Sequence, residues 1–130
     1  MERKNNGKKI LIIEDELPML KALSDKFSLE GFSVLEARNG NEGLNVALET
    51  KPDLILLDLL MPIMDGKAMM EKLRQDAWGK KVPIIILTNL NPDDKTLNEI
   101  IESGPAYYFI KSKWKLEDLV ARAKKELGVS

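Results

Sequence analysis

Short apolar runs alternate along the chain with longer segments in which apolar residues recur every three or four positions. The runs are rich in Ile, Leu and Val, and three of them barely alternate between apolar and polar residues. This pattern is typical of strands that are buried on both faces of a parallel sheet. The predicted strands are Lys9–Glu14, Ser33–Glu36, Asp53–Asp58, Val82–Thr88 and Tyr107–Lys111.

The intervening segments have the spacing of amphipathic helices. Their apolar positions are Leu20, Leu23 and Phe27; Leu44, Ala47 and Leu48; Met69, Met70 and Leu73; Leu97, Ile100 and Ile101; and Leu116, Leu119, Val120, Ala123 and Leu127. Asn91-Pro92 predicts the start of the fourth helix, and Gly31, Gly104 and Gly128 lie where helices should end.

Five strand–helix units in succession predict an α/β layer fold, a doubly wound (βα)5 sheet with helices on both faces and right-handed crossovers. We expect residues 9–128 to form one domain and residues 1–8 to be a flexible lead-in. The chain ends just after the fifth predicted helix, so we expect a stand-alone domain without an output domain.

The amino-acid composition excludes several classes of function. The chain has 130 residues, of which 20 are Lys or Arg and 21 are Asp or Glu, so no basic excess indicates direct nucleic-acid binding. The absence of His and Cys excludes histidine acid–base catalysis, a phosphohistidine carrier, thiolate metal sites and disulfides. No segment approaches the ~20 apolar residues needed to cross a bilayer, and none resembles a signal peptide. We therefore expect a cytoplasmic protein without a membrane partner.

Polar residues gather where predicted strands end. The first predicted strand ends at the acids Glu14 and Asp15, and Asp58, Thr88 and Lys111 close the third, fourth and fifth. The carboxyl ends of parallel strands share one sheet edge, and ligands bind there at the point where the strand order reverses. We therefore expect these side chains to converge on one crevice.

The chemistry of such a crevice can be argued from its residues. Carboxylates at close range repel one another unless a cation lies between them, and Mg²⁺ prefers oxygen ligands. Asp58 could then attack phosphorus and form an aspartyl phosphate, with Lys111 and the Thr88 hydroxyl stabilising the phosphoryl oxygens.

Each residue taken singly also has a structural interpretation. Asp58 could open a turn, and Glu14 and Asp15 could favour the dipole of the next helix. Thr88 could be an ordinary strand residue, and Lys111 a solvated charge. The convergence of all of them on one edge favours the functional interpretation.

The motifs that carry these residues resemble those of response-regulator receiver domains of two-component signalling, the CheY-like family. The likeness extends from about Lys8 to Gly128. The matching segments are ILIIEDE, which supplies Glu14 and Asp15; LILLDLLMPIMDG, which supplies Asp58; PIIILT, which supplies Thr88; and YYFIK, which supplies Tyr108 and Lys111.

This resemblance implies a flavodoxin-like sheet of order 2-1-3-4-5 and a phosphoacceptor role for Asp58. It implies direct Mg²⁺ ligation by Asp15, Asp58 and the backbone carbonyl of Leu60, with Glu14 near the metal. The implied donor is a histidine kinase or histidine phosphotransfer protein. Thr88 and Tyr108 would form the switch.

In the family, an output protein docks on the face made by the fourth helix, fifth strand and fifth helix. A receiver catalyses only its own phosphorylation and dephosphorylation, so we expect no enzyme.

The chain departs from the family pattern in the region of Lys111. Asn89 replaces a small residue, Pro105 replaces the usual Ala, and Ser112 replaces the proline that normally follows the lysine. Because a cis bond before a non-proline residue costs about 2.5–4 kcal/mol, we expect a trans Lys111–Ser112 bond.

Three alternative functions can be compared with the residues at these positions. An aspartate-nucleophile phosphatase would want a second Asp two residues after the nucleophile, where this chain has Leu60. A flavodoxin-type carrier would want a phosphate-binding loop after the first strand, where acids stand instead. A degenerate receiver that acts only as a phosphorylation-independent interaction module remains the principal alternative.

Overall fold

The computed structural model describes residues 6–58, 63–88, 98–99, 102, 104, 106–110 and 115–129, without the side chains of residues 63–67, 88, 106 and 110. Helices and strands alternate through most of this part of the chain. In chain order they are β1 (Lys9–Ile13), α1 (Leu17–Leu29), β2 (Ser33–Ala37), α2 (Gly40–Thr50), β3 (Leu54–Asp58), α3 (Ile63–Gln75), β4 (Ile84–Thr88), β5 (Ala106–Ile110) and α5 (Leu116–Leu127).

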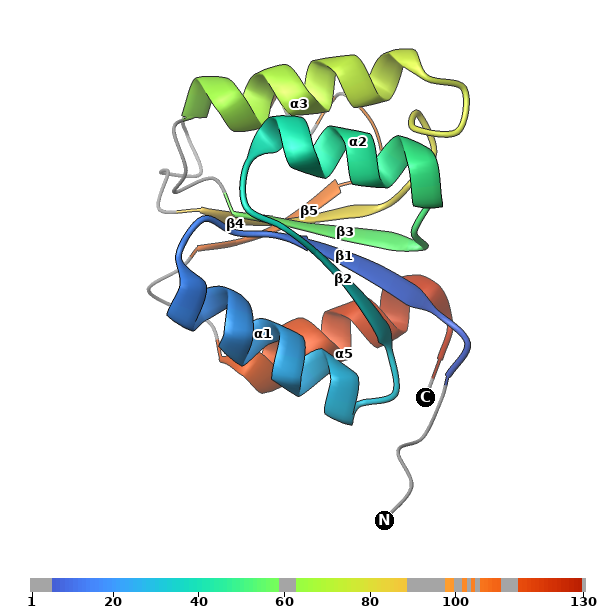
Figure 1. Cartoon of the computed structure of the whole chain (residues 1–130). Helices are drawn as coiled ribbons and strands as arrows, with labels where there is room; N and C mark the ends of the chain where they lie inside the picture. Colours follow the sequence, from blue (N-terminus) through green and yellow to red (C-terminus); the bar gives the residue numbers. More distant parts are fainter. Residues whose placement is uncertain are drawn as a thin grey trace.

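The strands form one parallel sheet in the order β2-β1-β3-β4-β5. Helices α1 and α5 cover one face of this sheet, and α2 and α3 cover the other (Figure 1). The predicted doubly wound fold and its strand order are confirmed. Strand order reverses between β1 and β3, which places the ends of these two central strands at the sheet's ligand-binding edge.

The core consists of two apolar layers separated by the sheet. Successive strand residues face opposite sides, so Ile10 and Ile12 pack with α1 and α5, while Leu11 and Ile13 pack with α2 and α3. Strand β3 is buried along its whole length. Its residues from Leu54 to Leu57 therefore have to be apolar whichever face they point to, which explains the unbroken hydrophobic run.

The sequence predicted which helices and strands form more accurately than it predicted where they begin and end. The strand bounds shift by one or two residues, and Glu14 lies just after β1 rather than inside it. The left-handed φ of 98° at Gly31 and of 67° at Gly128 confirms the predicted ends of α1 and α5. Leu48, one of the apolar positions of the second predicted helix, is 37% exposed, because α2 faces the sheet through Gly43 and Ala47.

The remaining helix prediction cannot be compared with the structure. Leu97, Ile100, Ile101 and the proposed cap Asn91-Pro92 lie outside the described residues. Among the helices that are described, none is long and apolar enough to cross a membrane. The boundaries of the predicted domain, 9–128, stay a prediction.

Candidate functional site

The site is built where β1 and β3 end side by side. The parallel register pairs Ile13 with Leu57, so the next residue of each strand, Glu14 and Asp58, emerges at the same edge of the sheet. Both lie in the centre of the sheet rather than on an outer strand. This explains why two acids separated by more than forty positions in the sequence come together.

Three carboxylates converge at this edge. Glu14, Asp15 and Asp58 each offer an oxygen atom, and these atoms lie within 4.8 Å of one another. Glu14 is fully buried and Asp58 is 1% exposed, whereas Asp15 is exposed to solvent. Two of the three negative charges are therefore removed from water, and burial of an uncompensated carboxylate is costly.

This crowding changes the ionisation of Glu14. Its pKa is raised from the ordinary value of 4.5 to about 8, first because the side chain is buried and then because of a hydrogen bond with Asp58. The amide of Glu16 opposes this rise in pKa by donating to Glu14 Oε2 at 3.1 Å, whereas the charge of Asp58 and a hydrogen bond with Asp15 add to it. Without a cation, the site keeps a proton on Glu14 at neutral pH.

The loop after β1 is held by contacts that the sequence did not reveal. The backbone amide of Glu14 donates to the Ala37 carbonyl at 3.0 Å, and Arg38 Nη2 donates to the Asp15 carbonyl at 3.1 Å. Both partners lie at the end of β2. Arg38 follows a strand as the other site residues do, and that position was the available signal for it.

The structure describes only some of the other residues predicted for the site. Thr88 ends β4, where its backbone pairs with Ile110, but its side chain lies outside the described residues. Tyr108 is half-buried in β5 and packs against the layer beneath α2 and α3.

Several further predictions fall on residues outside the description. These are Lys111, the Leu60 carbonyl, the departures Asn89, Pro105 and Ser112, and the trans state of the Lys111–Ser112 bond. They all stay predictions.

The donor set suits a hard divalent cation. All three side chains offer oxygen, the ligand atom that Mg²⁺ and Ca²⁺ prefer. A cation among them would also relieve the repulsion that raises the pKa of Glu14. The acidic cluster is of the kind typical of the Mg²⁺ site of receiver domains.

Comparison with known proteins agrees with this geometry. Residues 10–124 match the model of the response regulator receiver domain. The chain belongs to this family. This confirms the resemblance, and because receiver domains are not catalytic enzymes it also confirms that expectation.

Relatives of the receiver include regulators of transcription. The chain is 35% identical over 118 residues to the phosphate regulon transcriptional regulatory protein PhoB of Pseudomonas aeruginosa, covering 91% of this chain and 51% of that protein. It is 36% identical over 117 residues to the transcriptional regulatory protein PrrA of Mycobacterium leprae, covering 89% of this chain and 48% of that protein. The chain thus spans about half the length of the curated relatives it matches.

Solved receiver structures share the fold. The receiver domain of a signal transduction histidine kinase from Syntrophus aciditrophicus superimposes with a TM-score of 0.81 and 31% identity, covering 94% of this chain and 91% of that one. The receiver domain of a sensor histidine kinase from Pseudomonas aeruginosa, solved with magnesium in its active-site cleft, gives a TM-score of 0.80 and 25% identity, with 94% and 98% covered.

Proposed function

We propose that this receiver is a phosphorylation switch in which Asp58 accepts a phosphoryl group. The observation that carries the proposal is the burial of Asp58 beside Glu14 and Asp15 at the β1/β3 switch point. A carboxylate in this position is held by two strands and surrounded by ligands for a divalent cation. These are the conditions that phosphoryl transfer needs, because its catalysis is mostly positioning and charge stabilisation.

The donor would be a phosphohistidine on a partner protein, since this chain has no histidine. An oxygen of Asp58 attacks phosphorus, the bond from phosphorus to the donor nitrogen breaks, and the electron pair of that bond returns to the imidazole. Receiver domains pair with histidine kinases, and a kinase or phosphotransfer protein is the proposed partner. The proposed setting is the cytoplasm.

The residues around Asp58 have distinct proposed roles. Asp15, Asp58 and the carbonyl of Leu60 would hold Mg²⁺, with Glu14 close by; the neighbour from Pseudomonas aeruginosa with magnesium in its cleft supports this choice. When bound, the ion would neutralise charge on the phosphoryl oxygens. Lys111 and the Thr88 hydroxyl would contact the same oxygens.

The decisive experiment is intact-mass analysis after incubation with acetyl phosphate. We expect one added phosphoryl group in the presence of Mg²⁺, little with a chelator and none for Asp58→Asn. Asp25→Asn is the matched control, because Asp25 lies on the exposed face of α1 and the substitution changes charge equally. Equal labelling of Asp58→Asn would refute the acceptor, and no labelling of the wild type would favour an interaction module that works without phosphorylation.

A further inference from the structure

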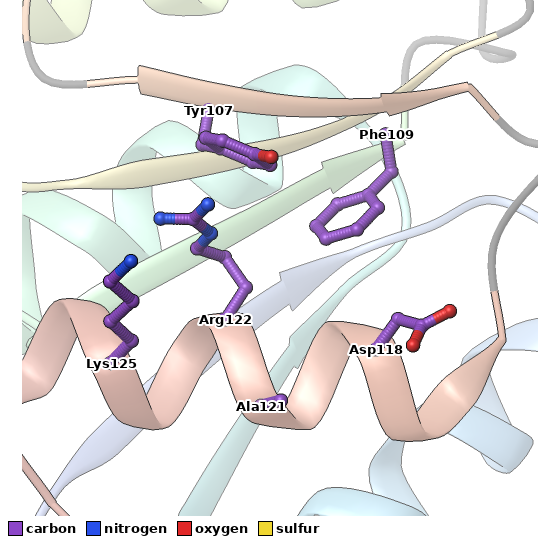
Figure 2. Close-up of a pocket in the computed structure, with 6 residues that line it drawn as sticks. All are labelled: Tyr107, Phe109, Asp118, Ala121, Arg122 and Lys125. Atoms are coloured by element: carbon purple, nitrogen blue, oxygen red, sulfur yellow. The ribbon is translucent and has the colours of Figure 1, made fainter.

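Arg38 is an exposed cation beside the acidic site. It directly follows β2, and its Nη2 donates to the Asp15 carbonyl at 3.1 Å. Another arginine, Arg122, lies between β5 and α5, with its guanidinium carbon 3.7 Å from the centroid of the Tyr107 ring (Figure 2). Tyr107 is near the start of β5, whereas the acidic site lies at the carboxyl ends of the parallel strands. Arg38 therefore belongs to the surroundings of the site, and Arg122 is a comparable arginine at a distance from it.

The peptide group between Asp15 and Glu16 is held at both of its polar atoms. Its carbonyl accepts the hydrogen bond from Arg38, and its N–H donates to Glu14 Oε2 at 3.1 Å. Because a peptide group is planar, two bonds on opposite sides restrict its orientation. Arg38 thus restrains the backbone that directly follows the Asp15 side chain, and the same peptide group contacts the Glu14 carboxylate.

Asp15 is the carboxylate of the site that depends most on this loop. Glu14 is fully buried and Asp58 is 1% exposed, so packed neighbours surround both side chains. Asp15 is exposed and lies beyond the end of β1, yet its oxygen is within 4.8 Å of oxygens of Glu14 and Asp58. With little packing to hold its side chain, its position depends on how firmly the backbone of the loop is held.

We propose that Arg38 is a positioning residue of the divalent-cation site, which holds the loop so that the Asp15 carboxylate lies beside Asp58. The inference rests on the proposed function, because it takes the acidic site to bind Mg²⁺. Arg38 would not touch the cation and would act only through the Asp15 backbone. Loss of a residue that orients a metal ligand typically lowers metal affinity by about 10–100-fold.

The charge of Arg38 acts in the opposite direction. A guanidinium near the site repels a divalent cation, so its removal would by itself strengthen Mg²⁺ binding. Salt separates this repulsion from positioning, because the Debye length falls from about 8 Å at 0.15 M ionic strength to about 3 Å at 1 M. A loss of affinity that persists at high salt would therefore come from the lost hydrogen bond.

The test is a titration of the ¹⁵N-labelled, unmodified protein with MgCl₂, followed by NMR at both of these ionic strengths. We expect Arg38→Met to raise the Kd for Mg²⁺ by about tenfold at each of them. Arg38→Lys keeps the charge and a single donor, so its Kd should lie between those of Arg38→Met and the wild type. A Kd of Arg38→Met equal to or below that of the wild type would overturn the proposal.

Two control variants separate positioning from other effects. Arg122→Met removes the same charge beside Tyr107 and should leave the Kd unchanged. Ser24→Ala removes a different contact between α1 and β2, the 2.5 Å hydrogen bond from Ser24 Oγ to Glu36 Oε2. It should lower the free energy of unfolding without changing the Kd. An equal rise of the Kd in either control would overturn the specific role of Arg38.

Hydrogen exchange reports on the restrained peptide group without any cation. We expect the Glu16 amide to exchange with solvent faster in Arg38→Met than in the wild type, because its bond to Glu14 loses the support of the second bond. The amide of Leu20, which donates to the Glu16 carbonyl at 2.9 Å in the first turn of α1, is the internal reference. Unchanged exchange at Glu16 would overturn the proposal.

These outcomes can be distinguished from those that test the proposed function. Normal phosphorylation of Asp58 with unchanged Mg²⁺ affinity in Arg38→Met would refute the role of Arg38 alone. Weakened Mg²⁺ binding in Arg38→Met without phosphorylation of the wild type would refute the phosphoacceptor alone. Absence of saturable Mg²⁺ binding by the wild type would overturn the metal site and, with it, the role of Arg38.

Discussion

Glu14 and Asp15 are neighbours in the sequence, yet one carboxylate is fully buried and the other is exposed. The buried one carries the raised pKa of about 8. A folded protein that must keep Glu14 protonated loses stability wherever the unfolded chain is free to ionise it. The acidic site is therefore a source of instability as well as of function.

A pH series should reveal this cost. The folded state binds the Glu14 proton more tightly than the unfolded chain does, because the pKa of Glu14 is about 8 in the folded protein and 4.5 in the unfolded chain. The stability that this proton contributes is complete below pH 4.5 and is lost as the pH rises through about 8. Without divalent cations, we expect the free energy of unfolding of Glu14→Gln, measured with urea, to exceed that of the wild type by more than about 1 kcal/mol at pH 8. At pH 4 we expect little difference between the two proteins.

Millimolar Mg²⁺ should stabilise the wild type at pH 8 and reduce the difference in the free energy of unfolding between the wild type and Glu14→Gln. Glu16→Gln changes the same charge at an exposed neighbour and is the control. A wild type that is more stable than Glu14→Gln at pH 8 without cations would contradict the raised pKa.

Arg74 is a buried cation on the side of the sheet covered by α3. It is 7% exposed, and its Nη1 donates to the carbonyls of Gly79 at 2.7 Å and Val82 at 2.8 Å. A Cβ atom at Gly104 would lie 2.6 Å from the Arg74 guanidinium carbon. The side chain therefore joins the end of α3 to the segments that precede β4 and β5.

Removal of the guanidinium should destabilise the domain. In Arg74→Met, two buried carbonyls lose their donor, and each such loss costs about 1–3 kcal/mol. We expect the free energy of unfolding, measured with urea, to fall by about 2–4 kcal/mol. Lys72→Met, at an exposed position of the same helix, should change it by less than about 0.5 kcal/mol. Similar values for both variants would contradict the role assigned to Arg74.

At the scale of elements, the close approach of α2 to β1 depends on a residue without a side chain. A Cβ atom at Gly43 would lie 2.5 Å from Ile13 Cδ1 and 2.9 Å from Ile13 Cγ1. Ile13 is the last residue of β1 and directly precedes Glu14. The packing of this helix thus bears on the position of the acidic site.

Gly43→Ala should therefore destabilise the domain although Ala is the better helix former. Overpacking costs about 1–3 kcal/mol, whereas the gain in helix propensity is about 1 kcal/mol, so we expect a net loss of about 1 kcal/mol in thermal or urea unfolding. Asn45→Ala on the exposed face of α2 should have the opposite sign, since it changes propensity without a clash. A stabilised Gly43→Ala would show that Ile13 moves aside easily.

At the scale of the whole molecule, the sheet links the acidic edge to its outer strand. Asp58 pairs with Leu87 across β3 and β4, and Ile86 pairs with Tyr108 across β4 and β5. If a phosphoryl group on Asp58 draws Thr88 inward, the space that it vacates is expected to change the rotamer of Tyr108. Such a shift requires contacts that differ between the two states, and the bond to Thr88 would be that difference.

Beryllofluoride, a phosphoryl mimic, should test this switch. We expect NMR shifts to concentrate at residues 87–104 and 107–111 and to be absent from Asp58→Asn. Chemical shifts from α1 and α2 serve as the internal reference. Changes confined to those two helices would contradict a switch through β4 and β5.

The sequence by itself determined the order of the helices and strands and the acidic residues of the site. Apolar runs and helical spacing depend on neighbours in the chain, so they predicted the order of elements. Motifs at strand ends predicted Glu14, Asp15 and Asp58 as one site. The strand order came from the resemblance, because periodicity alone does not say which strands are adjacent.

Only the tertiary structure decided the surroundings of individual side chains. The sequence cannot show that Glu14 is buried and Asp15 exposed, or that Arg74 is enclosed by backbone carbonyls. It also could not distinguish Tyr107, whose ring meets that of Phe109, from Tyr108, which packs on the other face of the sheet. Burial and pKa depend on atoms that are close in space but distant along the chain, and these contacts exist only after the layers have packed.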